Sequence, residues 1–161
     1  MAESRPRNLA LFKDFPDSDW EWLHGKLRRR YLREGEIIFC KGDEDATTFI
    51  IASGRVKVCV TTPEGRESVI AILSEGDCFG ELAALDGEPR SADAVAIEDS
   101  AVWCLAREDF TDLMERSTQF SRRLIASLDE YSEELTLHMA SKVPMLEEQF
   151  AARKHASRYG V

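Results

Sequence analysis

The sequence lacks the features that would assign it to the membrane, secreted or metal-binding classes. No apolar run approaches the ~18 residues that a membrane-spanning helix needs, and residues 1–12 contain no signal-peptide core. The four cysteines, Cys40, Cys59, Cys78 and Cys104, form no CxxC or other ligand-like cluster, and an iron–sulfur centre would need tighter spacing. We therefore expect a cytoplasmic protein whose cysteines are reduced and structural.

The sequence is also poor in residues that carry out catalysis. Its three histidines, His24, His138 and His155, lie far apart, and no nucleophile stands beside a base. No set of side chains has the spacing of metal ligands. We expect neither an enzyme nor a resident cofactor or metal ion.

Positive charge is scarce over most of the chain. The 21 Lys and Arg residues face 30 Asp and Glu residues, which gives a formal net charge of −9. Residues 1–33 hold eight cations against five carboxylates, whereas residues 34–161 hold thirteen against twenty-five. Because nucleic-acid affinity depends on cationic contacts, this acidic body argues against direct DNA binding. The run Arg28–Arg30 is interpreted as the solvated end of a helix.

The length of the chain, 161 residues, suits one domain with a sizeable core. Residues 8–33 are predicted to form a helical cover, because Trp20, Leu23 and Leu27 recur at helical spacing. Ser18 is the expected N-cap, with Glu21 three residues later completing a capping box.

Residues 34–107 change to short apolar runs, rich in β-branched and aromatic residues, that are separated by turns. Glycine or proline recurs roughly every 8–12 residues, as in antiparallel barrels and sandwiches. Thr62–Gly65 has the proline and glycine positions of a type I turn in a hairpin. This region is predicted to contain about eight short strands.

After Arg107 the pattern becomes helical again. Residues 108–143 are predicted to form a C-terminal unit of a hinge and a long helix, with the helix over about 120–142. The prediction rests on a stripe of residues at spacings of four and three, which are Phe120, Leu124, Leu128, Tyr131, Leu135 and His138. Pro144 ends or kinks this helix, and 144–161 form a short helical and basic tail. The apolar stripe either packs on its own β-domain or forms the seam of a homodimer.

Residues 80–91 combine groups that suit a phosphate beside a sugar. Gly80 lets a ligand approach the backbone, and a helical turn beginning at Glu81 would point amide groups at an anion. Arg90 could pair bidentately with phosphate oxygens, and Ser91 adds a hydroxyl donor. Glu81 is an acceptor that suits a sugar hydroxyl. The alternative is an ordinary ion pair between Glu81 and Arg90 across a turn.

Residues 76–96, GDCFGELAALDGEPRSADAVA, closely resemble the phosphate-binding cassette of cyclic nucleotide-binding domains. The family, which includes the catabolite activator protein and protein kinase A regulatory subunits, has FGE, a short loop and then R-[STA]-A. Residues 32–58, LREGEIIFCKGDEDATTFIIASGRVKV, are similar to the family's opening strands. The resemblance covers roughly residues 9–140 and is specific, because several motifs occur in the same order.

The resemblance implies a mainly β fold, an antiparallel, jelly-roll-like β-roll over 34–107 with N-terminal helices and a long C-terminal helix, within one domain of residues 1–143. It implies that Glu81 accepts the ribose hydroxyl. The implied cyclic-phosphate site consists of Arg90 and Ser91 with backbone amides near Gly80, Leu82 and Ala92. Val58 and Ile70 would line the sugar and base, and the base cap would come from Thr136, Tyr131, Leu135 or His138.

These features lead us to expect a regulatory module that binds cAMP in preference to cGMP. The ligand would shift the C-terminal helix through a hinge near Arg107–Ser117, and the module would signal to a protein effector, as a homodimer through that helix. Residues 144–161 are too few for a three-helix DNA reader. The alternatives are a ligand-independent dimeric interaction module, or a fragment or split relative of a cAMP-dependent transcription regulator.

Overall fold

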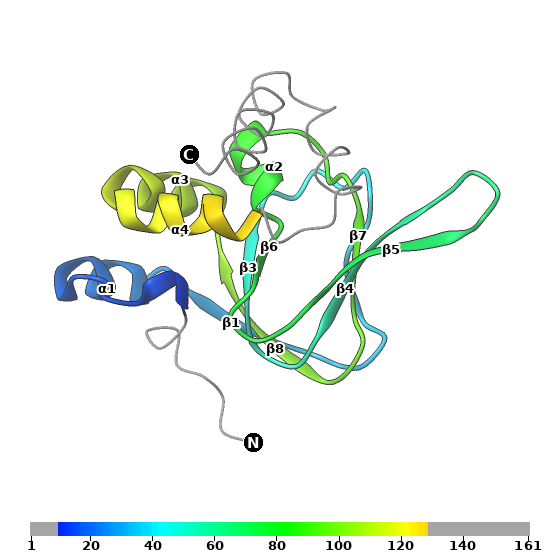
Figure 1. Cartoon of the computed structure of the whole chain (residues 1–161), viewed down its shortest axis with the longest axis horizontal. Helices are drawn as coiled ribbons and strands as arrows, with labels where there is room; N and C mark the ends of the chain where they lie inside the picture. Colours follow the sequence, from blue (N-terminus) through cyan, green and yellow to red (C-terminus); the bar gives the residue numbers. More distant parts are fainter. Residues whose placement is uncertain (1–9, 129–161) are drawn as a thin grey trace, which may run out of the picture.

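The computed structural model describes residues 10–128, which form a β-roll with helices packed on one side of it (Figure 1). Two antiparallel four-stranded sheets make up the roll, one in the order β1-β8-β3-β6 and the other in the order β2-β7-β4-β5. The strands are β1 (Arg28–Leu32), β2 (Ile37–Phe39), β3 (Thr48–Ser53), β4 (Val56–Thr61), β5 (Glu67–Leu73), β6 (Cys78–Phe79), β7 (Asp93–Ala96) and β8 (Ser100–Leu105). The helices are η2 (Ala10–Phe12), α1 (Asp17–His24), α2 (Glu81–Asp86), α3 (Arg107–Arg116) and α4 (Thr118–Leu128).

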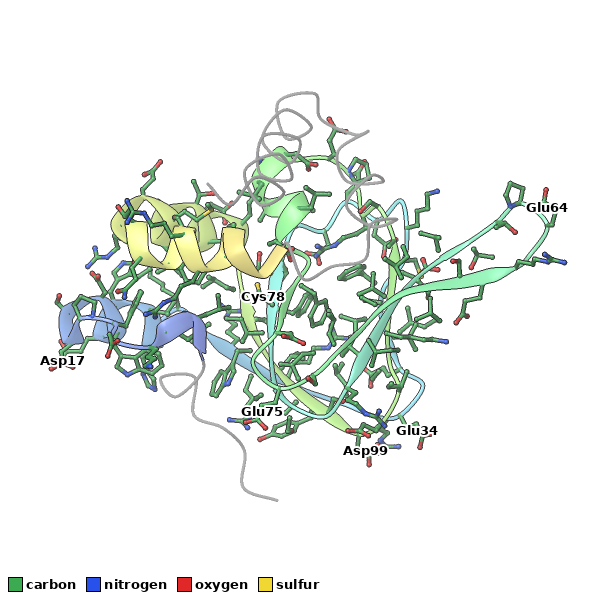
Figure 2. The ribbon with its side chains drawn as sticks, in the orientation of Figure 1. Asp17, Glu34, Glu64, Glu75, Cys78 and Asp99 are labelled. Carbon is green, nitrogen blue, oxygen red and sulfur yellow. The ribbon has the colours of Figure 1, made fainter. Side chains whose placement is uncertain are left out.

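The space between the two sheets is filled by inward-facing side chains, as the sticks in Figure 2 show. Successive residues of a strand point to opposite faces, so alternate residues of β3, β4 and β8 enter this core. It consists of Leu32, Phe39, Phe49, Ile51, Val56, Val58, Leu73, Phe79, Ala92, Ala94, Ala96 and Val102. Stacked Phe49 and Phe79, with ring centroids 5.1 Å apart, lie at the end of this core near α2.

A second core lies between the first sheet and the helices. The residues of β3 and β8 that point away from the roll interior, Ile50 and Leu105, contact this layer of η2, α1, α3 and α4. Phe12 stacks on Phe120 with ring centroids 5.8 Å apart, so the segments that precede and follow the roll in the sequence pack in one cluster. The β4–β5 hairpin projects on the other side, with Glu64 near its tip (Figure 2).

The predicted β-roll with about eight strands is confirmed, but two details of the predicted helical cover are wrong. Residues 28–32 are strand β1, not a helix end, because Arg28 to Leu32 pair with Cys104 to Ser100 of β8. Helix α1 begins at Asp17 after Pro16, and no side chain caps it, so Ser18 is not the N-cap. Proline suits this boundary because it has no backbone N–H to leave unpaired. The predicted turn at 62–65 is confirmed by a bond from Gly65 N–H to the Thr62 carbonyl.

The first part of the predicted C-terminal helix is present as α4. Phe120 and Leu124, the first two residues of the apolar stripe, are each 1% exposed and pack in the core formed with the roll's own helical layer. The beginning of the stripe therefore packs on its own domain. The rest of the predicted helix, from residue 129, and the tail 144–161 lie outside the described residues.

Candidate functional site

The predicted helical turn between β6 and β7 is present as α2, Glu81–Asp86. Gly80 precedes it at φ +81° and Gly87 ends it at φ +72°, both in the left-handed region that glycine adopts without steric cost. A Cβ at Gly80 would lie 2.8 Å from Arg90 Nη1 and 2.9 Å from the Thr47 carbonyl oxygen. Gly80 is therefore required both by its backbone angle and by the close approach of Arg90.

Arg90 is buried at the end of the roll interior, with 3% of its surface exposed. Its Nη1 donates to the Gly80 carbonyl at 2.8 Å, and its Nη2 donates to the Thr47 carbonyl at 2.7 Å. Nη2 also pairs with the Asp45 carboxylate at 2.8 Å. The guanidinium lies 4.1 Å from the centroid of the Phe39 ring. Arg90 is thus held inside the protein rather than on its surface, and its carboxylate partner at 2.8 Å is Asp45.

The position of Arg90 is fixed by its backbone as well as by its side chain. Its N–H donates to the Asp43 carbonyl, and its carbonyl accepts from Gly42 N–H, both at 2.8 Å. Within residues 10–128 its Nε, which is also buried, has no hydrogen-bond acceptor. A buried N–H without an acceptor is costly, so this atom favours an anion at the site.

Glu81, the predicted ribose acceptor, is the first residue of α2 and is 1% exposed. It follows Gly80, whose carbonyl accepts from Arg90, so the two charged residues are held at the same end of α2. Of the other predicted phosphate-site residues, Leu82 and Ala92 are buried and Ser91 is half-buried. The bond from Arg90 to the Gly80 carbonyl therefore joins the two parts of the cassette at the start of α2.

Val58 and Ile70, predicted to line the sugar and base, lie on the neighbouring strands β4 and β5, and each is 7% exposed. The register between these strands shifts at Val58 and Cys59, which pair with Ala71 and Val69 and leave Ile70 as the extra residue of a β-bulge. The residues predicted to cap the base, Thr136, Tyr131, Leu135 and His138, lie outside the described residues.

Sequence reasoning missed Asp45, which contacts Arg90 from a position 45 residues earlier. Its other carboxylate oxygen accepts from the Thr47 hydroxyl and backbone N–H. Partial burial alone would raise the pKa of the Asp45 carboxyl, but hydrogen bonds from Arg90 and Thr47 and the charge of Arg90 outweigh it, so the pKa lies below its usual value. The sequence showed only a run of acidic residues here, with no local signal for a partner.

Arg107, the first residue of α3, connects this helix to α2. Its Nε donates to the Ala84 carbonyl at 3.1 Å, which satisfies a carbonyl in the last turn of α2. A Cβ at Gly87 would lie 2.8 Å from Arg107 Nη2, so the glycine makes room for the guanidinium. The cassette and the start of the predicted hinge are therefore in direct contact.

Within residues 10–128, no three His, Cys, Asp or Glu side chains are grouped to hold a metal ion. No helix of this part of the chain is long and apolar enough to cross a bilayer. All four cysteines are free thiols, and burial raises the pKa of the Cys78 thiol well above its usual value. A protonated thiol is a poor nucleophile, so the expected structural role suits Cys78.

Comparison with known proteins identifies this region. The model of the family described as cyclic nucleotide-binding domain matches residues 29–117, which include every strand and the whole of α2 and α3 apart from Arg28 of β1. A cyclic AMP receptor protein of Thermus thermophilus is 37% identical over 122 residues, which are 76% of this chain and 56% of that protein. Human cGMP-dependent protein kinase 2 is 36% identical over 108 residues, 65% of this chain and 14% of the kinase.

Among solved structures, the catabolite activator protein of Thermus thermophilus superposes with a TM-score of 0.66 at 33% identity. The match covers 78% of this chain and 57% of that one. The chain thus spans little more than half the length of the T. thermophilus relatives. These relatives carry further regions that the matched part does not include.

Proposed function

This chain belongs to the cyclic nucleotide-binding domain family, and on that premise we propose that it binds cAMP and transmits the bound state to its C-terminal helices. The proposed ligand contacts use the residues of the cassette. Arg90, with Ser91 and the backbone amides of Gly80, Leu82 and Ala92, binds the cyclic phosphate. Glu81 accepts the ribose 2′-hydroxyl, and Val58 and Ile70 line the sugar and base.

The observation that carries this proposal is the buried Arg90 beside the buried Glu81. A cationic side chain is rarely buried unless it is paired, and Arg90 is 3% exposed while its Nε has no acceptor within residues 10–128. An incoming cyclic phosphate would supply that acceptor. The acidic Glu81 would repel the same phosphate, so its proposed partner is a neutral hydroxyl.

The preference for cAMP over cGMP is supported by the bacterial relative. The T. thermophilus protein is named a cyclic AMP receptor protein, and its identity to this chain extends over 122 residues. The human relative is a cGMP-dependent kinase, with a shorter match. The base cap, for which Thr136, Tyr131, Leu135 and His138 are candidates, would contribute to this preference.

The route proposed from ligand to helix begins at α2. A ligand that displaces the cassette on binding also displaces Ala84, whose carbonyl accepts a hydrogen bond from Arg107 of α3. Helix α3 contacts α4, and the two helices share a core with η2 and α1. The ligand shifts this layer only by as much as it prefers one arrangement over the other. The proposed partners that respond to this shift are a second copy of the chain and a protein effector, in the cytoplasm. No catalytic step is proposed.

Thermal unfolding with and without nucleotide tests the proposal. A ligand at 100 times its Kd stabilises the folded state by about 2.7 kcal/mol, which raises Tm by several degrees. We expect cAMP to raise Tm at lower concentration than cGMP, and 5′-AMP, which lacks the cyclic phosphate, to have little effect. A chain whose Tm responds to none of the three would be a ligand-independent interaction module.

A further inference from the structure

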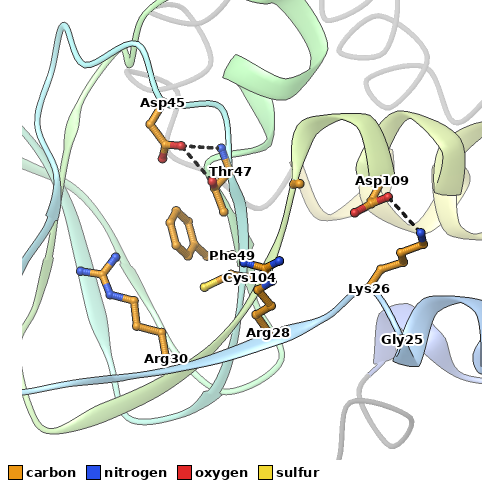
Figure 3. Close-up of a pocket in the computed structure, with 10 residues that line it drawn as sticks. Gly25, Lys26, Arg28, Arg30, Asp45, Thr47, Phe49, Cys104 and Asp109 are labelled. Atoms are coloured by element: carbon orange, nitrogen blue, oxygen red, sulfur yellow. Dashed lines mark hydrogen bonds and ion pairs between the residues drawn. The ribbon is translucent and has the colours of Figure 1, made fainter.

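A pocket with a volume of about 710 Å³ opens where β1 faces the loop between β2 and β3 (Figure 3). Its cationic wall comes from Lys26, Arg28 and Arg30, and Asp45 and Thr47 lie across from them. Gly80, Glu81, Leu82, Ser91 and Ala92 are not among its lining residues. This pocket is therefore separate from the proposed cyclic-phosphate site, although both touch residues that hold Arg90.

Two arginines occupy positions of β1 that face the interior of the roll. Arg28, Arg30 and Leu32 alternate along the strand and so share one face, and Leu32 is buried in the core between the sheets. Arg30 pairs in register with Val102, which also belongs to that core. Both side chains reach solvent at the end of this core, because Arg28 is exposed and the Arg30 side chain is 41% exposed. A ligand in the pocket can therefore contact both.

The cations that line the pocket do not all have a carboxylate partner among the described residues. Arg30 is bonded to Glu36 at 3.2 Å, and Lys26 lies 3.9 Å from Asp109. The Asp45 carboxylate is already bonded to Arg90 and Thr47. The side chain of Arg28 is exposed and makes no hydrogen bond or ion pair with any residue of the part described, 10–128. Among the described residues, Arg30 has Glu36 and Lys26 has Asp109 as a carboxylate partner, so Arg28 is the cation of this pocket without one.

We propose that this pocket is a second anion site, which binds a small phosphate compound with at least two negative charges through Arg28 and Arg30. Alternate residues of a strand are about 7 Å apart, so two long side chains from one face can reach the same ligand. Guanidinium groups bind phosphate oxygens bidentately. Figure 3 shows both side chains leaving β1 on the side of the loop that carries Asp45 and Thr47. The ligand also lies opposite Asp45, which favours a compact anion held on the β1 side.

This site does not depend on the cyclic nucleotide function, because its residues are not in the cassette. The probe is inorganic pyrophosphate, titrated by calorimetry at constant ionic strength so that general screening stays the same. A parallel NMR titration locates the bound anion through backbone amide shifts. The variant is the double substitution Arg28→Gln and Arg30→Gln. The matched control is Arg66→Gln with Arg55→Gln, which removes the same charge at positions that do not line the pocket.

We expect pyrophosphate to bind with a Kd below about 1 mM and to shift amides of residues 26–30 and 104–106. The β1 double variant should bind at least about tenfold more weakly, because it loses two charge-assisted contacts, and the control should bind as the unchanged chain does. Shifts confined to residues 80–92, equal binding by both variants, or no binding at all would each overturn the proposal. Loss of binding in both variants would also overturn it, as an effect of net charge.

Discussion

At the scale of single residues, the motif predicted the importance of Arg90 but not the contacts that hold its side chain. The sequence placed one arginine among acidic residues and left an ordinary ion pair with Glu81 open as an explanation. In the structure its guanidinium is buried against the ring of Phe39 and bonded to two carbonyls, which sequence spacing could not reveal. The acidic partner is Asp45, contributed by a distant loop. A residue anchored in this way is positioned before any ligand arrives, which reduces the entropy lost on binding.

Glu81 is predicted to recognise the ribose 2′-hydroxyl. The unchanged chain should bind 2′-deoxy-cAMP about tenfold or more weakly than cAMP, because a hydrogen bond to a charged acceptor contributes roughly 1.5–3 kcal/mol. Glu81→Gln should bind cAMP more weakly and discriminate less between the two nucleotides. Calorimetry of the four combinations gives the coupling energy directly. Glu88→Gln, a change at an exposed residue of the same loop, is the control. Equal discrimination in all three proteins would remove Glu81 from the ribose site.

Asp45 is predicted to contribute a pH-dependent part of the stability. Its pKa is lowered in the folded state, so the contribution is fully present above the unfolded value, near 3.8, and is lost as pH falls through the lower folded value. The side chain is 52% exposed, so the effect should be about 1 kcal/mol or less. Urea unfolding should show Asp45→Asn to be less stable at neutral pH, with the difference in stability shrinking as pH falls below the unfolded value. Glu64→Gln at the hairpin tip serves as the control. A difference that grows on acidification would contradict this account.

At the scale of elements, the sequence predicted the roll well and its first strand wrongly. Most strands from β2 to β8 are short apolar runs, rich in β-branched and aromatic residues and separated by turns, and these local signals are sufficient. Strand β1 carries three consecutive arginines and sits directly after a helix, so it has no such pattern. Its strand conformation comes from pairing with β8, more than 65 residues later. The predicted N-cap was wrong for a local reason, because the helix begins at Asp17, directly after Pro16 and before Ser18.

The contact between α2 and α3 is predicted to stabilise the end of the cassette. Gly87→Ala places a Cβ in the left-handed region and 2.8 Å from Arg107 Nη2. Gly65→Ala imposes a similar angle, φ +83°, with no atom within 4 Å of its Cβ. Each should lose about 1–2 kcal/mol from backbone strain, and Gly87→Ala should lose roughly 0.5–1.5 kcal/mol more if the Arg107 bond to Ala84 breaks. Urea unfolding measures both. Equal losses of stability in the two variants would mean that the Arg107 side chain moves away from the new Cβ with no further cost in stability.

At the scale of the whole molecule, two cores meet at the first sheet of the roll. Phe49 and Ile51 of β3 face the interior and Ile50 faces the helices, so one strand belongs to both cores. Helix α2 of the cassette follows β6, which pairs with β3, and Arg107 begins α3 directly after β8. A change in the cassette therefore has short physical routes to the helical layer. The base cap and the dimer seam were predicted for residues beyond 128, so both stay predictions.

The central claim is that Arg90 binds the phosphate of a cyclic nucleotide. Isothermal titration of cAMP into the unchanged chain and into Arg90→Lys tests it most directly, because lysine keeps the charge but loses the planar fork. We predict one cAMP per chain and at least about tenfold weaker binding by the variant, provided that its circular dichroism spectrum shows an intact fold. Equal affinities, or no heat of binding in either protein, would contradict the account.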